Sequence, residues 1–242
     1  MALLPSLLLW NFIFLVFGGV AAILLRGSVR PGWFGLALIL YNINVLLVLG
    51  PVFYDDSLVS LIGLGPFEFN WIGKVLALAT TLAILIFGHI SLKEAGLTFR
   101  QSPRARLGWI VLAGLIALAV AMALYMPDQT HSTESILYQL TMPSLEEEIF
   151  HRGLLLAVLF RAFDPKTKMP PRRFAVAPVI SAAMFTLIHG LYMSEGGLGI
   201  SLEALIFAGI FAVLLTWLRL RTGSVVAPII LHSAVNTIWR VL

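Results

Sequence analysis

The sequence predicts an all-α protein, a polytopic transmembrane bundle of about eight helices. Of its 242 residues, 60% are hydrophobic and only 12% are charged, whereas soluble domains carry roughly 25% charged residues. The apolar residues fall into eight segments, each close to the roughly 20 residues that a helix needs to cross a bilayer. We therefore predict a single integral membrane domain over residues 1–242, whose main partner is the lipid bilayer.

Four predicted spans lie in the N-terminal half, at about 3–25, 33–53, 71–92 and 107–126. The first span has no basic segment before it, and its apolar run is too long for the core of a signal peptide. We therefore expect it to be retained as a transmembrane helix.

The other four predicted spans lie at about 146–163, 174–192, 199–218 and 224–241. The fifth span is short and starts within a run of glutamates, so its start is placed by local signals. Pro143 and Ser144 suit a helix start, and Ser144 with Glu147 matches a capping box. Residues 133–142 are then expected to form a short interfacial helix before this span.

The connections between spans alternate in charge. Acidic residues follow the even-numbered spans: Asp55, Asp56, Glu68, Asp128, Glu134, Glu146 and Glu195. Basic residues follow the odd-numbered spans: Arg26, Arg30, Lys93, Arg100, Arg104, Arg106, Arg161, Lys166, Lys168, Arg172, Arg173, Arg219 and Arg221. Because basic loops usually face the cytoplasm, both termini are expected outside. The net charge of +4 thus orients helices and does not predict a nucleic-acid partner.

The chain contains no cysteine. Disulfides, thiol nucleophiles and thiolate metal sites are therefore excluded. The redox compartment stays open, because a helical membrane bundle needs no disulfides.

Three groups of chemically distinctive side chains lie at or within the C-terminal spans. They are Glu147 and Glu148 with Arg152, Phe185 with His189, and His232 with Asn236. Ionisable groups are costly in hydrocarbon and usually face a protein interior or a water-filled cavity, so they mark functional sites. With the predicted topology, the three groups converge in the outer half of the membrane, with Glu147 at the outer end of the fifth span.

Each group also has a structural interpretation. The glutamates could be favourable acids in the first turn of a capped helix, and His189 could be a hydrogen-bonded residue near the end of a span. His232 and Asn236 lie one turn apart and could form interhelical hydrogen bonds. An imidazole and an amide on one helix face could equally donate to a developing oxyanion.

Together, in this order and on separate spans, the three groups resemble the CAAX protease and bacteriocin-processing (CPBP, or Abi) family of glutamic-type intramembrane endopeptidases. The family motifs E-E-x-x-x-R, F-x-x-x-H and H-x-x-x-N are similar to residues 147–152, 185–189 and 232–236. The resemblance covers roughly residues 140–242, so the catalytic motifs are expected in 143–242. By residue, it implies water activation by Glu147 and His189, oxyanion stabilisation by His232 and Asn236, and a supporting role for Glu148, Arg152 and Phe185.

The resemblance leaves the question of a metal open. Glu147, His189 and His232 would also make a plausible ligand set for zinc or another divalent metal. We favour a reaction without metal or cofactor, because no H-E-x-x-H pair is present on one helix.

The predicted topology bears on the substrate. A site facing outward favours a prokaryotic plasma-membrane enzyme that cuts a membrane-anchored or exported protein or peptide, such as a C-terminal sorting or anchor signal. The alternative is a prenyl-protein endopeptidase of the CAAX type that faces the cytosol.

A non-catalytic peptide-binding scaffold or a transporter is the alternative of another class. Transporters often show repeat symmetry and broken helices in both halves. Here the polar groups cluster in the C-terminal half alone, which favours the enzyme.

Overall fold

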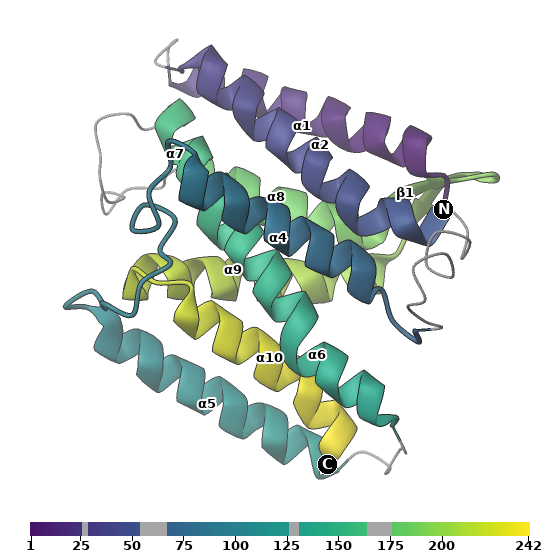
Figure 1. Cartoon of the computed structure of the whole chain (residues 1–242), viewed down its shortest axis with the longest axis vertical. Coiled ribbons are helices and arrows are strands. Elements are labelled where there is room, and N and C mark those ends of the chain that lie inside the picture. Colours follow the sequence, from purple (N-terminus) through teal and green to yellow (C-terminus); the bar gives the residue numbers. More distant parts are fainter. Residues whose placement is uncertain (26–28, 54–66, 126–130, 164–175) are drawn as a thin grey trace.

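The computed structural model describes residues 1–25, 29–53, 67–125, 131–163 and 176–242, except for the side chains of 51–53. It confirms an all-α bundle (Figure 1). Its helices are α1 (Leu3–Leu24), α2 (Pro31–Phe53), α4 (Trp71–Phe87), α5 (Ala105–Ala123), α6 (Thr133–Glu147), η1 (Glu148–Leu155), α7 (Leu156–Phe163), α8 (Val176–Gly190), α9 (Leu202–Thr222) and α10 (Val226–Val241).

Four of the described helices are long and apolar enough to cross a membrane. They are α1, the Pro31–Gly50 part of α2, α5 and α9. Two further apolar helices, α4 and α8, are shorter. The chain is thus an integral membrane protein, whereas the count of eight spans stays a prediction.

The fifth predicted span begins earlier than expected. Helices α6, η1 and α7 run on continuously from Thr133 to Phe163, so the separate interfacial helix does not exist. The N-cap is Ser132, whose side chain accepts a hydrogen bond from the N–H of Ser135. Pro143 lies inside α6, and the predicted capping box at Ser144 is wrong.

Ser144 has a tertiary partner in place of a capping role. Its hydroxyl donates to the carbonyl of Thr141 at 3.0 Å and lies 2.5 Å from the hydroxyl of Ser233 in α10. The capping motif describes only local sequence, so it could not foresee this contact between helices.

The middle of this long helix is a π-helix. All eight residues of η1 are buried. π-helical segments are rare, mostly a single turn long, and frequent at functional sites. The N-terminal half packs against η1, since Tyr41 and Phe14 of that half share one hydrophobic core with Phe150 and Leu154.

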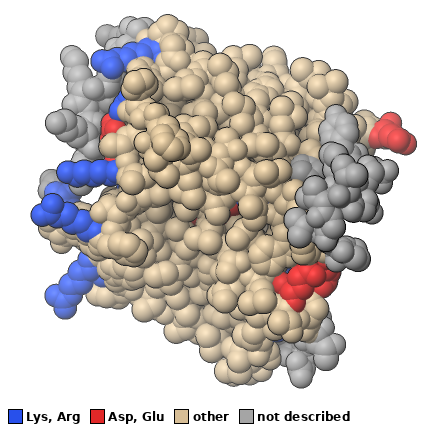
Figure 2. Space-filling model, viewed as in Figure 1, with Lys and Arg blue, Asp and Glu red and all other residues tan. Residues whose placement is uncertain are grey.

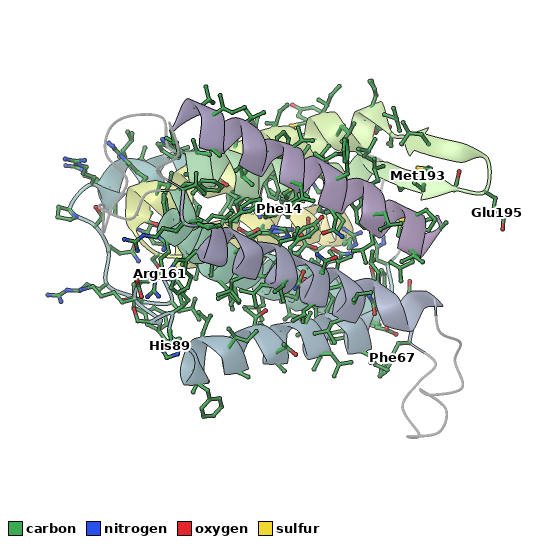
Figure 3. All side chains as sticks on the ribbon, turned by 90° about the horizontal axis from the view of Figure 1, so that it is seen from above. Phe14, Phe67, His89, Arg161, Met193 and Glu195 are labelled. Carbon is green, nitrogen blue, oxygen red and sulfur yellow. The ribbon has the colours of Figure 1, made fainter. Side chains whose placement is uncertain are left out.

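A β-hairpin that was not predicted follows α8. Strand β1 (Leu191–Ser194) pairs antiparallel with β2 (Gly197–Ile200). The outer edge of β1 is covered by α1, because Met193 accepts from the N–H of Ala2 and Trp10 donates to the carbonyl of Leu191. Figure 3 shows the hairpin extending past the ends of the neighbouring helices, with Glu195 at its tip.

The other strand of the hairpin has a free edge. Leu198 faces Met193 in the register, and Ile200 faces Leu191. Since Met193 and Leu191 use their backbone groups towards α1, the matching groups of Leu198 and Ile200 point outward on the opposite side. No hydrogen bond joins the backbone of these two residues to a neighbouring element within the described ranges.

Charge is separated between the two ends of the bundle. On the face shown in Figure 2, the Lys and Arg side chains gather at one end, where some acidic atoms lie among them, and further Asp and Glu side chains lie at the opposite end. Both termini lie at the acidic end (Figure 1), and Arg161 lies at the end opposite Glu195 (Figure 3). Several charges used for the topology prediction lie outside the described residues: Arg26, Asp55, Asp56, Asp128, Lys166, Lys168, Arg172 and Arg173.

Candidate active site

The candidate site is centred on Glu147, the last residue of α6. Its Oε2 atom lies 3.9 Å from Nε2 of His189 in α8 and 4.0 Å from Nε2 of His232 in α10. Three helices far apart in the sequence therefore bring the predicted water-activating and oxyanion-binding side chains to one point.

The hydrogen bonds of the two imidazoles assign their protons. Nδ1 of His189 lies 2.6 Å from the carbonyl oxygen of Phe185. Nδ1 of His232 lies 2.8 Å from Oε1 of Glu148. A carbonyl and a carboxylate oxygen can only accept, so both Nδ1 atoms carry hydrogen. In a neutral ring, Nε2 then presents a lone pair towards Glu147.

Glu148 and Arg152 form the predicted i,i+4 ion pair. Nη1 of Arg152 lies 3.0 Å from Oε1 of Glu148, and both side chains are fully buried. The same carboxylate oxygen contacts His232, so this pair orients the imidazole. Phe185 stacks under the Arg152 guanidinium at 4.1 Å and lies beside the His189 ring at 4.5 Å.

Asn236 lies one turn beyond His232 on α10 and is half-buried. Within the part of the chain that the structure describes, its side chain makes no hydrogen bond, and its backbone carbonyl accepts from Arg240. Its role towards an oxyanion stays a prediction.

Sequence reasoning missed three residues of this site. Nζ of Lys74 in α4 lies 2.6 Å from Oε1 of Glu147 and 2.7 Å from Oε2 of Glu146. Asn44 of α2 donates to the other oxygen of Glu146 at 2.6 Å. The placement of Glu146 in an outer acidic connection is therefore wrong, because this residue is 1% exposed.

A signal for Lys74 was present in the sequence. It is a single cation inside the apolar segment 71–92, and an ionisable group in such a segment usually has a partner and a function. Because Lys74 is far from Glu146 and Glu147 along the chain, the sequence did not indicate that it pairs with them.

Glu147 lies inside a longer helix than expected. Helix α6 begins at Thr133 and contributes 15 residues, the last of which is Glu147. Another 16 helical residues follow in η1 and α7. Glu147 is thus in the middle of a continuous helix, and the expectation that it starts a span is wrong.

The site remains reachable from the surface. The side chain of Glu147 is 15% exposed and that of His189 is 38% exposed. Figure 2 shows acidic atoms at the bottom of a hollow in the apolar surface. Glu147 is therefore partly open to the surface, whereas Glu148 and Arg152 are fully buried.

Glu147, His189 and His232 were also predicted as an alternative set of metal ligands. Ligands of a tetrahedral zinc ion at about 2.0–2.2 Å lie roughly 3.4 Å from each other, so separations of 3.9 and 4.0 Å are wider than a zinc shell. The other oxygen of Glu147 is bound by the Lys74 cation. No cluster of three potential ligands with metal-site geometry occurs within the described ranges.

Comparison with protein-family models matches residues 129–238 to the family described as type II CAAX prenyl endopeptidase Rce1-like. The match covers fewer than half of the chain's residues and indicates the CPBP family. The Rce1-like region spans α6 to α10, so it contains every predicted site residue, whereas Lys74 and Asn44 lie outside it. The family indicates a hydrolase, a protease that acts on a membrane-associated protein.

No curated protein and no solved structure proved similar to the chain.

Proposed function

We propose that this chain is a glutamic-type intramembrane endopeptidase that cuts a membrane-associated protein with water activated by Glu147 and His189. The observation that carries the proposal is the approach of one carboxylate oxygen to two imidazole Nε2 atoms, at 3.9 and 4.0 Å.

The gap between Glu147 and His189 suits one water molecule. Polar atoms separated by more than 3.5 Å are often bridged by water, and two hydrogen bonds of about 2.8 Å that meet at a water oxygen span about 4 Å. Both protein atoms would accept, so the water would donate both protons and turn its lone pairs to the scissile carbonyl. Glu147 then takes a proton as this oxygen attacks, and it gives the proton to the leaving amine when the C–N bond of the tetrahedral intermediate breaks.

The tetrahedral intermediate needs a donor for its oxyanion. His232, whose Nδ1 lies 2.8 Å from Oε1 of Glu148, is the first proposed donor, and it can donate from Nε2 only as an imidazolium. Asn236, one turn away, is the second proposed donor.

The substrate must present an extended segment. Extended peptides commonly bind by adding a strand to a free sheet edge, and β2 offers outward N–H and C=O groups at Leu198 and Ile200. Ile200 pairs in register with Leu191, two residues after His189. This supports cleavage of a single-span or lipid-anchored protein beside the hairpin, near the outer membrane boundary, such as a C-terminal sorting or anchor signal.

The orientation decides between two substrates. The basic end of the bundle is expected in the cytoplasm, which places the hairpin, both termini and the opening of the site outside in a prokaryotic plasma membrane. The name of the matched family favours the alternative, a prenylated CAAX protein cut from the cytosolic side.

Reporter fusions should separate these cases. A periplasmic-type reporter, active only outside the cytoplasm, should be active at the C-terminus and inactive after Arg161. The same reporter placed near Glu195 should be active, since the hairpin lies at the acidic end (Figure 3). The reverse pattern would make the cytosol-facing CAAX activity the leading function.

Purified protein should cleave a reconstituted single-span reporter, and the rate should survive stringent chelation because no metal takes part in the proposed step. The readout is the product and its cleavage position by mass spectrometry. His89→Ala, at an exposed residue beside Arg161 at the basic end (Figure 3), is the control for histidine loss and should keep the full rate.

Two outcomes would contradict the proposal. Activity lost on chelation and restored by zinc would establish the metal set of Glu147, His189 and His232. No cleavage of an authentic membrane partner that binds the protein would favour the scaffold or transporter.

A further inference from the structure

Lys74 reaches the candidate site from the N-terminal half of the chain. Its ammonium lies 2.6 Å from Oε1 of Glu147, on the opposite carboxylate oxygen from the one that faces the two histidines. We infer that Lys74 is a positioning residue that holds Glu147 and presents its Oε2 to the water. This inference rests on the proposed function.

Lys74 is mostly buried and makes short contacts with two carboxylates. The Lys74 side chain is 10% exposed, and its two carboxylate partners lie at 2.6 and 2.7 Å, the distances of charge-assisted hydrogen bonds. An ammonium in hydrocarbon is costly and is retained where it is paired. Lys74 therefore has a fixed place between α4 and α6.

The second carboxylate partner of Lys74 is also held in place by hydrogen bonds. Glu146 binds the ammonium through Oε2 and receives a hydrogen bond from Asn44 through Oε1. Asn44 belongs to α2, so α2, α4 and α6 form one chain of polar contacts that ends at Glu147. Each link narrows the positions that the reactive carboxylate can adopt.

Holding Oε1 has a chemical consequence. A free carboxylate could turn and present either oxygen, or bind the histidines directly. With Oε1 held by Lys74, Oε2 stays at 3.9 Å from His189, which leaves room for a water. Misplacement of a reacting group by about 1 Å can cost on the order of 10²-fold in rate.

A purely structural role for Lys74 is the competing explanation. In that case Lys74 would only neutralise the buried Glu146 carboxylate, and Glu147 would keep its position without it. The positioning role and the purely structural role predict opposite cleavage rates for a protein that lacks the charges of both Lys74 and Glu146.

The experiment measures kcat and KM for cleavage of a reconstituted single-span reporter. Lys74→Met keeps the length of the side chain and removes the cation, and kcat should fall about 10²-fold with little change in KM. Lys93→Met, at an exposed loop position, is the matched control and should behave as the wild type.

The double variant Lys74→Met with Glu146→Gln separates the two roles. It removes one buried cation and one buried anion together, so it should fold even if Lys74→Met alone does not. It should remain about 10²-fold slow in kcat if Lys74 positions Glu147. Recovery of the wild-type kcat would overturn the inference.

The outcome also distinguishes this inference from the proposed function. If the wild type cleaves, Glu147→Gln does not, and the double variant cleaves at the wild-type rate, only the role of Lys74 is wrong. If Glu147→Gln cleaves as fast as the wild type, the proposed function itself is wrong.

Discussion

Replacing Glu147 with glutamine should reduce peptide cleavage by about 10²–10⁴-fold, the range that general-base catalysis contributes, while the protein stays folded. Glutamine has nearly the same shape as glutamate, but its amide cannot take a proton from water. Lys74 keeps Glu146 as an ionic partner in this variant, so no cation is left buried alone.

The measurement is kcat on the reconstituted reporter, together with the thermal midpoint of unfolding in detergent. Glu203→Gln, at an exposed position in the first turn of α9, is the matched control and should leave both quantities unchanged. Cleavage by Glu147→Gln at the control rate would remove Glu147 as the base.

Replacing Arg152 with alanine should destabilise the protein and abolish its activity together. Breaking a fully buried ion pair costs about 3–5 kcal/mol in soluble proteins, and here Glu148 would lose its guanidinium partner inside the bundle. The Phe185 ring would also lose the cation stacked on it. The loss of activity follows because Glu148 orients His232.

The free energy of unfolding in mixed micelles is the measurement for this variant. Arg161→Ala is the control, since Arg161 pairs with Glu94 at the surface, where an ion pair contributes about 0–1 kcal/mol. If Arg152→Ala were as stable as the wild type yet inactive, Arg152 would have a direct catalytic role in place of an architectural one.

The sequence was sufficient to predict the helical bundle and the composition of the polar groups. Apolar segment length predicts helices in a bilayer, and a spacing of four residues places Glu148 near Arg152 and Phe185 near His189. These contacts are local, so the structure agrees with them. That the three groups meet was predicted from the topology, which places them at a similar depth, and the structure brings Glu147 close to both histidines.

Contacts between distant elements were not predictable in the same way. Lys74 and Glu146 lie 72 positions apart, and no periodicity in either segment predicts that they pair. Ser144 matched a local capping motif but bonds across to Ser233. The hairpin escaped prediction because Leu191–Ile200 is a glycine-rich stretch between two apolar runs, and its stability depends on α1.

The Lys74 contact has a consequence for the biogenesis of the protein. During synthesis α4 is made before Glu146 and Glu147, so its lysine enters the membrane environment without its partners. Lysine is unfavourable on membrane-insertion scales, and Lys74 is the fourth residue of α4, which has only 17 residues. The ammonium of Lys74 therefore gains its ionic partners only when α6 has been made, so the C-terminal half completes the polar contacts of α4.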